Sequence, residues 1–142
     1  MAPHTPIRVF LLSGSRLLRE VLGHVLRKTA DILVVGAYPY SVDAPAEIIE
    51  STCDVLLADS VSVLTLDRQV HDNLRSLLSQ LRVVVIELDD SASTFLQFAR
   101  LYVMDYVLKE ATVTEVISAI RSVAKLEAVR RAASISYDEV PR

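Results

Sequence analysis

The sequence predicts an α/β domain built on a doubly wound parallel sheet of five strands, in the order 2-1-3-4-5. Short apolar runs alternate five times with longer segments of helical periodicity, which is the pattern of repeated strand–helix pairs. The apolar runs have no polar face, so both faces of the sheet are expected to be covered by helices. Right-handed crossovers between parallel strands leave few topologies, and the stated order is the one we expect.

The first half of the chain is expected to contain three strands and two helices. The strands are the apolar runs at 7–12, 32–37 and 54–59. A helix over 15–28 lies between the first two, because apolar residues recur there at helical spacing with arginines on the other face. A shorter helix over 41–52 follows, with Asp43 as its cap and Pro45 in its first turn.

The second half of the chain continues the alternation up to a final helix. Its expected elements are a helix over 66–81, a strand over 82–88, a helix over 91–101 and a strand over 103–108. The last helix opens at Thr112 with Thr-Val-Thr-Glu, a capping box. Beyond Leu126 the apolar stripe is lost, so we expect the helix to end there in a linker. The predicted organisation is an N-terminal tail over 1–6, a domain over 7–126, and a helix end with its linker over 127–142.

Composition argues against several classes of protein. Hydrophobic residues make up 51% of the chain and charged residues 23%, which suits a full core and not a disordered chain. The net charge of −3 argues against direct binding of nucleic acid. The single cysteine, Cys53, excludes an internal disulfide and is typical of a reducing cytoplasm. The N-terminus has no signal-peptide pattern, and no apolar run reaches the roughly 18 residues of a membrane helix, so we expect a cytoplasmic protein without membrane contact.

Candidate functional residues gather at one edge of the predicted sheet. Doubly wound sheets bind ligands beyond the carboxyl ends of their strands, beside the switch in strand order. Five residues follow strand ends and are expected there: Ser13, Gly14, Asp59, Glu87 and Lys109. Asp59 comes directly after a buried apolar run, which points to a function at this edge. Taken by itself, an aspartate at a strand end can also be no more than a cap for the turn that follows.

The order of elements and two of these sites resemble the receiver domain of bacterial two-component response regulators, over about residues 7–126. "DVLLAD" is similar to the third strand of that family, which ends in its phosphoacceptor, here Asp59. "DYVLKEAT" resembles the fifth strand, which ends in the family lysine, here Lys109, with Tyr106 at the position of the switch aromatic. "IRVFLLSGSRLLREVL" resembles the first strand and helix of the family, and its ending "RLLREVL" is similar to receivers that are attached to helix-turn-helix DNA-binding domains. The resemblance implies the flavodoxin-like (βα)5 fold and a signalling role without enzymatic activity, with a sensor kinase or an effector domain as partner.

The sequence departs from the family pattern at its chemical positions. Two adjacent acids follow the first strand in working receivers and hold Mg²⁺, whereas Ser13 and Gly14 stand there in this chain. A Thr or Ser follows the fourth strand in the family, where this chain has Glu87. After the phosphoacceptor, "SVSVLTLD" has neither the proline nor the glycine of the usual turn.

These departures remove what phosphoryl transfer to a carboxylate requires. A divalent cation has to neutralise and align the anionic groups, and Mg²⁺ needs one or two carboxylates together with water and phosphate oxygens. Asp59 supplies a single carboxylate, and Glu87 would repel an incoming phosphoryl group by about 4 kcal/mol at ~4 Å and an effective dielectric of 20. The three histidines, His4, His24 and His71, are scattered and predict no metal site. We therefore predict no Mg²⁺ or other cofactor and inefficient phosphorylation.

The sequence thus predicts a pseudo-receiver that signals through phosphorylation-independent protein contacts. We expect it to regulate a DNA-binding effector domain that this chain does not contain. Two alternatives stay open: a receiver that is still phosphorylated on Asp59, and a small-ligand or nucleotide-binding domain that uses the backbone N–H groups of Ser13, Gly14 and Ser15.

Two structural predictions accompany this function. Lys109 is expected to pair with Asp59, Glu87 or both, because a lysine between two acids lowers their mutual repulsion. A homodimer is expected through the face formed by the fourth helix, the fifth strand and the fifth helix of the family fold. The aromatic residues predicted to contribute to that face are Phe95, Phe98, Tyr102 and Tyr106.

Overall fold

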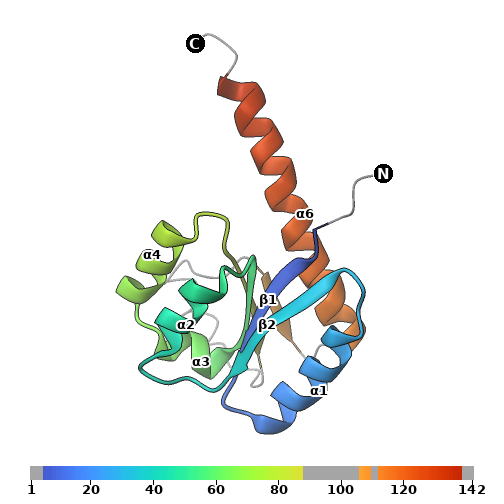
Figure 1. Ribbon diagram of the computed structural model, residues 1–142, viewed down its shortest axis with the longest axis vertical. Coiled ribbons are helices and arrows are strands. Elements are labelled where there is room, and N and C mark those ends of the chain that lie inside the picture. The colour runs from blue at the N-terminus through green and yellow to red at the C-terminus, as the bar shows by residue number, and fades with distance from the viewer. Residues whose placement is uncertain (1–4, 88–105, 110–111, 139–142) are drawn as a thin grey trace.

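The computed structural model describes the backbone of residues 5–87, 106–109 and 112–138, and the side chains of 5–86 and 112–125. Its elements in chain order are β1 (Ile7–Leu12), α1 (Arg16–Arg27), β2 (Ile32–Tyr38), α2 (Ala44–Ser51), β3 (Val55–Asp59), α3 (Ser60–Thr65), α4 (Arg68–Leu77), β4 (Arg82–Glu87), β5 (Tyr106–Lys109) and α6 (Val113–Asp138). The sheet lies at the centre of the molecule with helices on both faces (Figure 1).

The predicted α/β fold with a parallel sheet is confirmed. The strands pair in the order β2-β1-β3-β4-β5, and every pairing is parallel. β5 is a short strand that begins at Tyr106 and extends to Lys109, one residue beyond the predicted end. The predicted strand residues 103–105 and the predicted helix over 91–101 lie outside the described residues.

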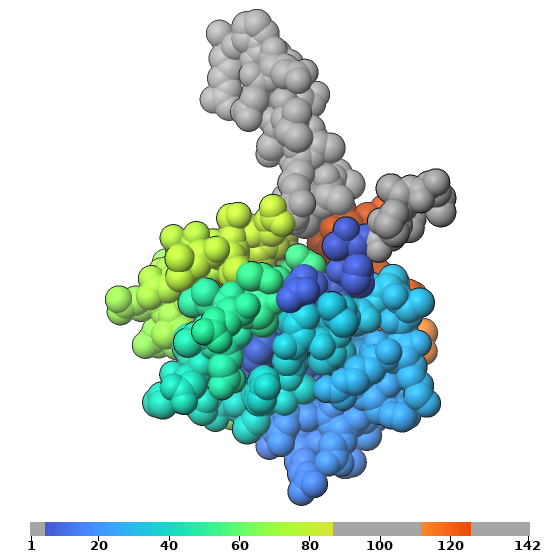
Figure 2. All heavy atoms as spheres, in the orientation of Figure 1, coloured from blue at the N-terminus to red at the C-terminus, as the bar shows by residue number. Residues whose placement is uncertain are grey.

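Alternate residues of β1 point into two separate cores. Val9 and Leu11 join the cluster that packs against α1 and α6, whereas Phe10 and Leu12 join the cluster that packs against α2, α3 and α4. β1 is therefore buried on both faces, which explains why its sequence has no polar alternation. Figure 2 shows α2 and α4 on one side of the visible face and α1 on the other.

Cys53 lies at the edge of the second of these cores, as a small buried residue. Its side chain is 4% exposed. Burial raises the pKa of its thiol to about 11, because the thiolate would lose its hydration there. A thiol in this state is inert, so Cys53 acts as a small apolar residue and not as a nucleophile.

The helices between β3 and β4 differ in two ways from what the sequence predicts. The predicted single helix over 66–81 is shorter, since α4 begins after its cap Asp67 and ends at Leu77. The separate helix α3 directly after β3 was missed, because its short apolar segment carries no helical periodicity of its own. α2 begins at Ala44, and Asp43 occupies the cap position without a side-chain hydrogen bond to the helix.

α6 is longer than the sequence predicts. It starts as expected: the Thr112 hydroxyl accepts the Glu115 N–H at 3.2 Å and donates to the Glu115 carboxylate at 3.1 Å. It then continues to Asp138 instead of ending near Leu126. The segment that follows Leu126 is rich in Ala, Arg and Glu and contains no Gly or Pro before Pro141, so helix propensity persists where the apolar stripe stops.

The first part of α6 packs on the sheet and the second part leaves it. α6 contacts α1, β3, β4 and β5. Figure 1 shows its C-terminal half projecting beyond the body of the domain. The apolar stripe is lost where the helix no longer has a sheet to cover, which accounts for the sequence change near Leu126. None of the helices in the described part of the chain combines the length and apolarity needed to cross a membrane.

Candidate functional site

The carboxyl ends of β1 and β3 bring Ser13, Gly14 and Asp59 together, as the sequence predicts. β1 and β3 are neighbours in the sheet, with Leu12 opposite Ala58, so the residues that follow these two are side by side. Ser13 is fully buried and Asp59 is 3% exposed. A carboxylate this deeply buried requires hydrogen-bond donors around it, because its loss of hydration is costly.

Among the described residues, three donors surround the Asp59 carboxylate, and all three are neutral groups. The Ser13 hydroxyl and the Gly14 N–H, at 3.2 Å, donate to Oδ2. The Ser62 N–H donates to Oδ1 at 2.7 Å. Asp59 is therefore the N-cap of α3, and both of its oxygens are engaged. The cap reading of Asp59, which the sequence left open, describes its contacts in this structure.

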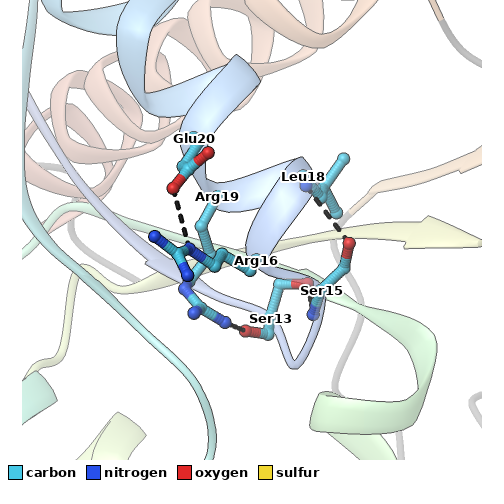
Figure 3. Close-up of polar contacts among 6 residues, drawn as sticks. All are labelled: Ser13, Ser15, Arg16, Leu18, Arg19 and Glu20. Atoms are coloured by element: carbon cyan, nitrogen blue, oxygen red, sulfur yellow. Dashed lines mark hydrogen bonds and ion pairs between the residues drawn. The ribbon is translucent and has the colours of Figure 1, made fainter.

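The loop between β1 and α1 is held by its own hydrogen bonds (Figure 3). The Ser15 hydroxyl accepts the Leu18 N–H at 3.2 Å and so caps α1, while the Ser15 N–H donates to the Ser13 hydroxyl oxygen at 3.1 Å. Arg19 reaches back from the first turn of α1, and its Nη1 donates to the Ser13 carbonyl at 2.6 Å. The Ser13 side chain is thus oriented toward Asp59 by contacts on both sides of it.

These contacts bear on the anion-binding alternative. An anion at the start of a helix would be held by free backbone N–H groups. The N–H groups of Gly14, Ser15 and Leu18 each donate to an oxygen of this chain instead. These three donors are therefore engaged by side chains of the loop and by Asp59, and they give the ligand-binding alternative no support.

α3 is held at its other end by His71, a residue that the sequence reasoning did not assign. The His71 ring is 2% exposed and its Nε2 lies 3.1 Å from the Val63 carbonyl oxygen. Burial lowers the pKa of His71, with the carbonyl contact acting in the opposite direction. One signal was present in the sequence: His71 stands three residues before Leu74, which is also buried, and so shares its helix face.

The remaining predicted site residues are placed by backbone pairing alone. Asp59 pairs with Ile86, and Glu87 pairs with Lys109 across β4 and β5. The three strand ends therefore lie side by side, in the arrangement the predicted ion pair needs. The side chains of Glu87, Tyr106 and Lys109 lie outside the described residues, so that ion pair and the switch role of Tyr106 stay predictions.

The dimer face also stays a prediction. The positions that carry its aromatic residues, Phe95, Phe98 and Tyr102, lie outside the described residues as well, and the side chain of Tyr106 is not described.

The described residues around Asp59 do not fit a magnesium ion. Mg²⁺ requires hard oxygen ligands that offer lone pairs to the metal. Here the Ser13 hydroxyl donates its proton to Asp59, and Gly14 presents an N–H in place of a second carboxylate. Among the side chains of residues 5–86 and 112–125, no three metal-ligating groups gather at one place. Among the described residues, the Asp59 carboxylate accepts hydrogen bonds from neutral donors, and the absence of Mg²⁺ binding stays a prediction.

A cavity of about 750 Å³ opens at the opposite, amino edge of the sheet. Its charged lining residues include Asp31, Asp54 and Arg121. Arg121 of α6 holds Asp31 through two hydrogen bonds of 2.8 and 2.9 Å, and this contact lowers the pKa of Asp31. Asp54 accepts the Arg8 N–H at 2.9 Å. Both acids of this cavity thus have partners within the chain, and the cavity is remote from Asp59.

The fold is that of response-regulator receiver domains. The chain is similar to the signal receiver domain of NarL from Mycobacterium tuberculosis, with a TM-score of 0.70 and 24% identity over 86% of this chain and 98% of that one. It is similar to the receiver domain of a modulated diguanylate cyclase from Desulfovibrio desulfuricans G20, with a TM-score of 0.74 and 17% identity over 89% and 99%. A DNA-binding response regulator of the LuxR family from Staphylococcus aureus matches with a TM-score of 0.68 and 14% identity over 82% and 98%.

Comparison with protein-family models and with curated proteins finds no match. Identities of this size to solved structures establish a shared fold, and the chemistry of the site has to be argued from the residues of this chain.

Proposed function

We propose that this chain is a pseudo-receiver: a receiver-type signalling domain that acts through protein contacts and without phosphorylation of Asp59. The observation that carries the proposal is the set of contacts around Asp59. Its carboxylate accepts hydrogen bonds from Ser13, Gly14 and Ser62 and caps α3. A carboxylate engaged in this way is a structural group, because a phosphoryl group on it would displace these donors from a buried position.

The proposed output is regulation of an effector domain in the two-component manner. The shared fold with the LuxR-family regulator, which is described as DNA-binding, supports an effector of that kind. α6 supports it physically, since the helix continues past the body of the domain and offers a rigid connection (Figure 1). A homodimer through the face that includes β5 and α6 belongs to this proposal. Mass measured by light scattering with and without beryllofluoride tests it, and a dimer in both conditions is the expected result.

The decisive experiment is a phosphorylation assay on the purified chain. With acetyl phosphate and Mg²⁺, we expect no phosphorylated species by intact-mass spectrometry, because the described residues around Asp59 include no second carboxylate and both Asp59 oxygens already accept hydrogen bonds. Calorimetry with millimolar Mg²⁺ is expected to show no binding that depends on Asp59. Phosphorylation that is lost in Asp59→Asn would overturn the proposal and favour a receiver that still switches.

Gly14→Asp is the informative gain-of-function variant. A Cβ added at Gly14 meets no atom within 4 Å, and the backbone there has no positive φ, so the residue can be accommodated. The variant places a second carboxylate beside Asp59, and we expect it to gain measurable Mg²⁺ binding. Ser15→Asp is the matched control, because it adds the same charge to the same loop at a position that caps α1 and does not contact Asp59. We expect the control to bind no better than the parent chain.

A further inference from the structure

α3 is a six-residue helix that depends on side chains at both of its ends. A helix this short is not stable by itself, since nucleation is costly and few hydrogen bonds follow. At its start the Ser62 N–H donates to Asp59, and at its end the Val63 carbonyl lies within hydrogen-bonding distance of His71 Nε2. N–H groups at the start of a helix and carbonyls at its end have no partner within the helix, so each side chain satisfies one of them.

The His71 contact requires a proton on Nε2, which both the Nε2–H tautomer of the neutral ring and the protonated ring carry. The carbonyl oxygen of Val63 can only accept, so Nε2 has to donate. His71 belongs to the fully buried side chains, and its partner Val63 and its helix neighbour Leu74 both belong to the apolar cluster on this face of the sheet. A second proton would turn the ring into a cation inside this apolar cluster, and the charged form would favour water.

The charged groups near His71 do not offset this cost. Asp67, Asp72 and Arg75 act on it from its own helix, the two acids favouring the charged ring and Arg75 opposing it. Burial outweighs them, so the pKa of His71 lies below its ordinary value of 6.5.

In the described part of the chain, the neighbouring elements bring no charge that acts on His71 beyond these three. α3 carries no ionisable residue, and the strand residues of the same core are apolar. The two acids of α2, Glu47 and Glu50, line a surface pocket next to β2 that Tyr38 also lines. Asp59 lies at the opposite end of α3, where it holds the Ser62 N–H.

We propose that α3 is a proton-sensitive latch over Asp59. Uptake of a proton by His71 drives the ring out of the core, the Val63 carbonyl loses its partner, and α3 opens. Asp59 then loses the Ser62 N–H and becomes accessible from the side that α3 had covered. The inference does not depend on the proposed function, because it concerns how the carboxylate is covered and not whether it is phosphorylated.

The test is amide hydrogen exchange followed by NMR between about pH 7 and pH 5. The open state binds one more proton than the closed state at pH values below about 6.5, so the protection factor of the Ser62 amide should fall by about tenfold per pH unit until the lowered pKa of His71 is reached. The Leu18 amide, which Ser15 caps at the start of α1, is the internal reference and should keep its protection factor. Equal losses at Ser62 and Leu18 would indicate global unfolding and overturn a local latch.

Two histidine variants complete the experiment. His71→Gln keeps a donor for the Val63 carbonyl and cannot titrate, so the protection of Ser62 should become independent of pH. His24→Gln, on the exposed face of α1, should retain the pH dependence of the parent chain. Loss of the dependence in His24→Gln, or its persistence in His71→Gln, contradicts the proposal. If His71→Gln fails to fold, direct NMR titration of His71 in the parent chain decides, since a midpoint at or above 6.5 contradicts the latch.

Discussion

Two aspartates cap neighbouring helices with the same chemistry but in different surroundings. Asp59 caps α3 by accepting the Ser62 N–H at 2.7 Å, and Asp67 caps α4 by accepting the Val70 N–H at 2.9 Å. Asp67 is exposed, so water can replace its hydrogen bond. Asp59 is buried and holds further donors, so its loss leaves polar groups that water cannot reach. The same kind of cap is therefore expected to contribute little to stability at Asp67 and much more at Asp59.

The largest expected effect is that of Asp59→Ala. The substitution removes the cap of α3 and leaves the Ser13 hydroxyl and the Ser62 N–H without their acceptor in a buried place. We expect a loss of about 3 kcal/mol in the free energy of unfolding. Denaturant titration measures it. Asp59→Asn, which keeps an acceptor oxygen, should lose clearly less, and equal losses would mean that the negative charge and not the cap is what matters.

Ser13→Ala comes next. It deletes the hydroxyl that donates to Asp59 Oδ2, while the Gly14 N–H remains. Hydrogen bonds to charged acceptors are the stronger kind, so we expect about 2 kcal/mol of destabilisation by the same titration. Ser15→Ala, which removes an ordinary cap of α1 from the same loop, should cost about 1 kcal/mol. If the two serines behave alike, Ser13 has no special role at Asp59.

Asp67→Ala sharpens the comparison from the exposed side. Because the Val70 N–H can turn to water when its cap is removed, the expected loss is about 1 kcal/mol, as for ordinary caps. Its effect and that of Asp59→Ala should be measured under identical conditions. A loss at Asp67 as large as that at Asp59 would show that burial does not distinguish the two sites.

The smallest expected effect concerns the ion pair at the other edge of the sheet. Arg121 and Asp31 are 52% and 45% exposed, so solvent screens their attraction and Arg121→Gln should change stability within experimental error near neutral pH. The pKa of Asp31 is lowered below 3.8, so any contribution is present above that pH and lost on acidification through the lowered value. A clear loss of stability at pH 7 would assign Arg121 a role in positioning α6.

Local patterns in the sequence determined most of the scaffold. Continuous apolar runs marked β1, β3 and β4, because strands covered on both faces need no polar alternation. Helical spacing marked α1, and the capping box marked the start of α6. The position of Asp59 at the carboxyl edge of the sheet followed from the same patterns, since it directly ends an apolar run.

The tertiary structure alone decided what Asp59 does. Its partner Ser13 is 46 residues away in the chain, and only the pairing of β1 with β3 brings the two together. α3 has too few residues for a periodic signal and exists because Asp59 and His71 satisfy its two ends. Sequence patterns report which face a residue presents. Whether a buried polar group finds its partner depends on segments that meet only after folding.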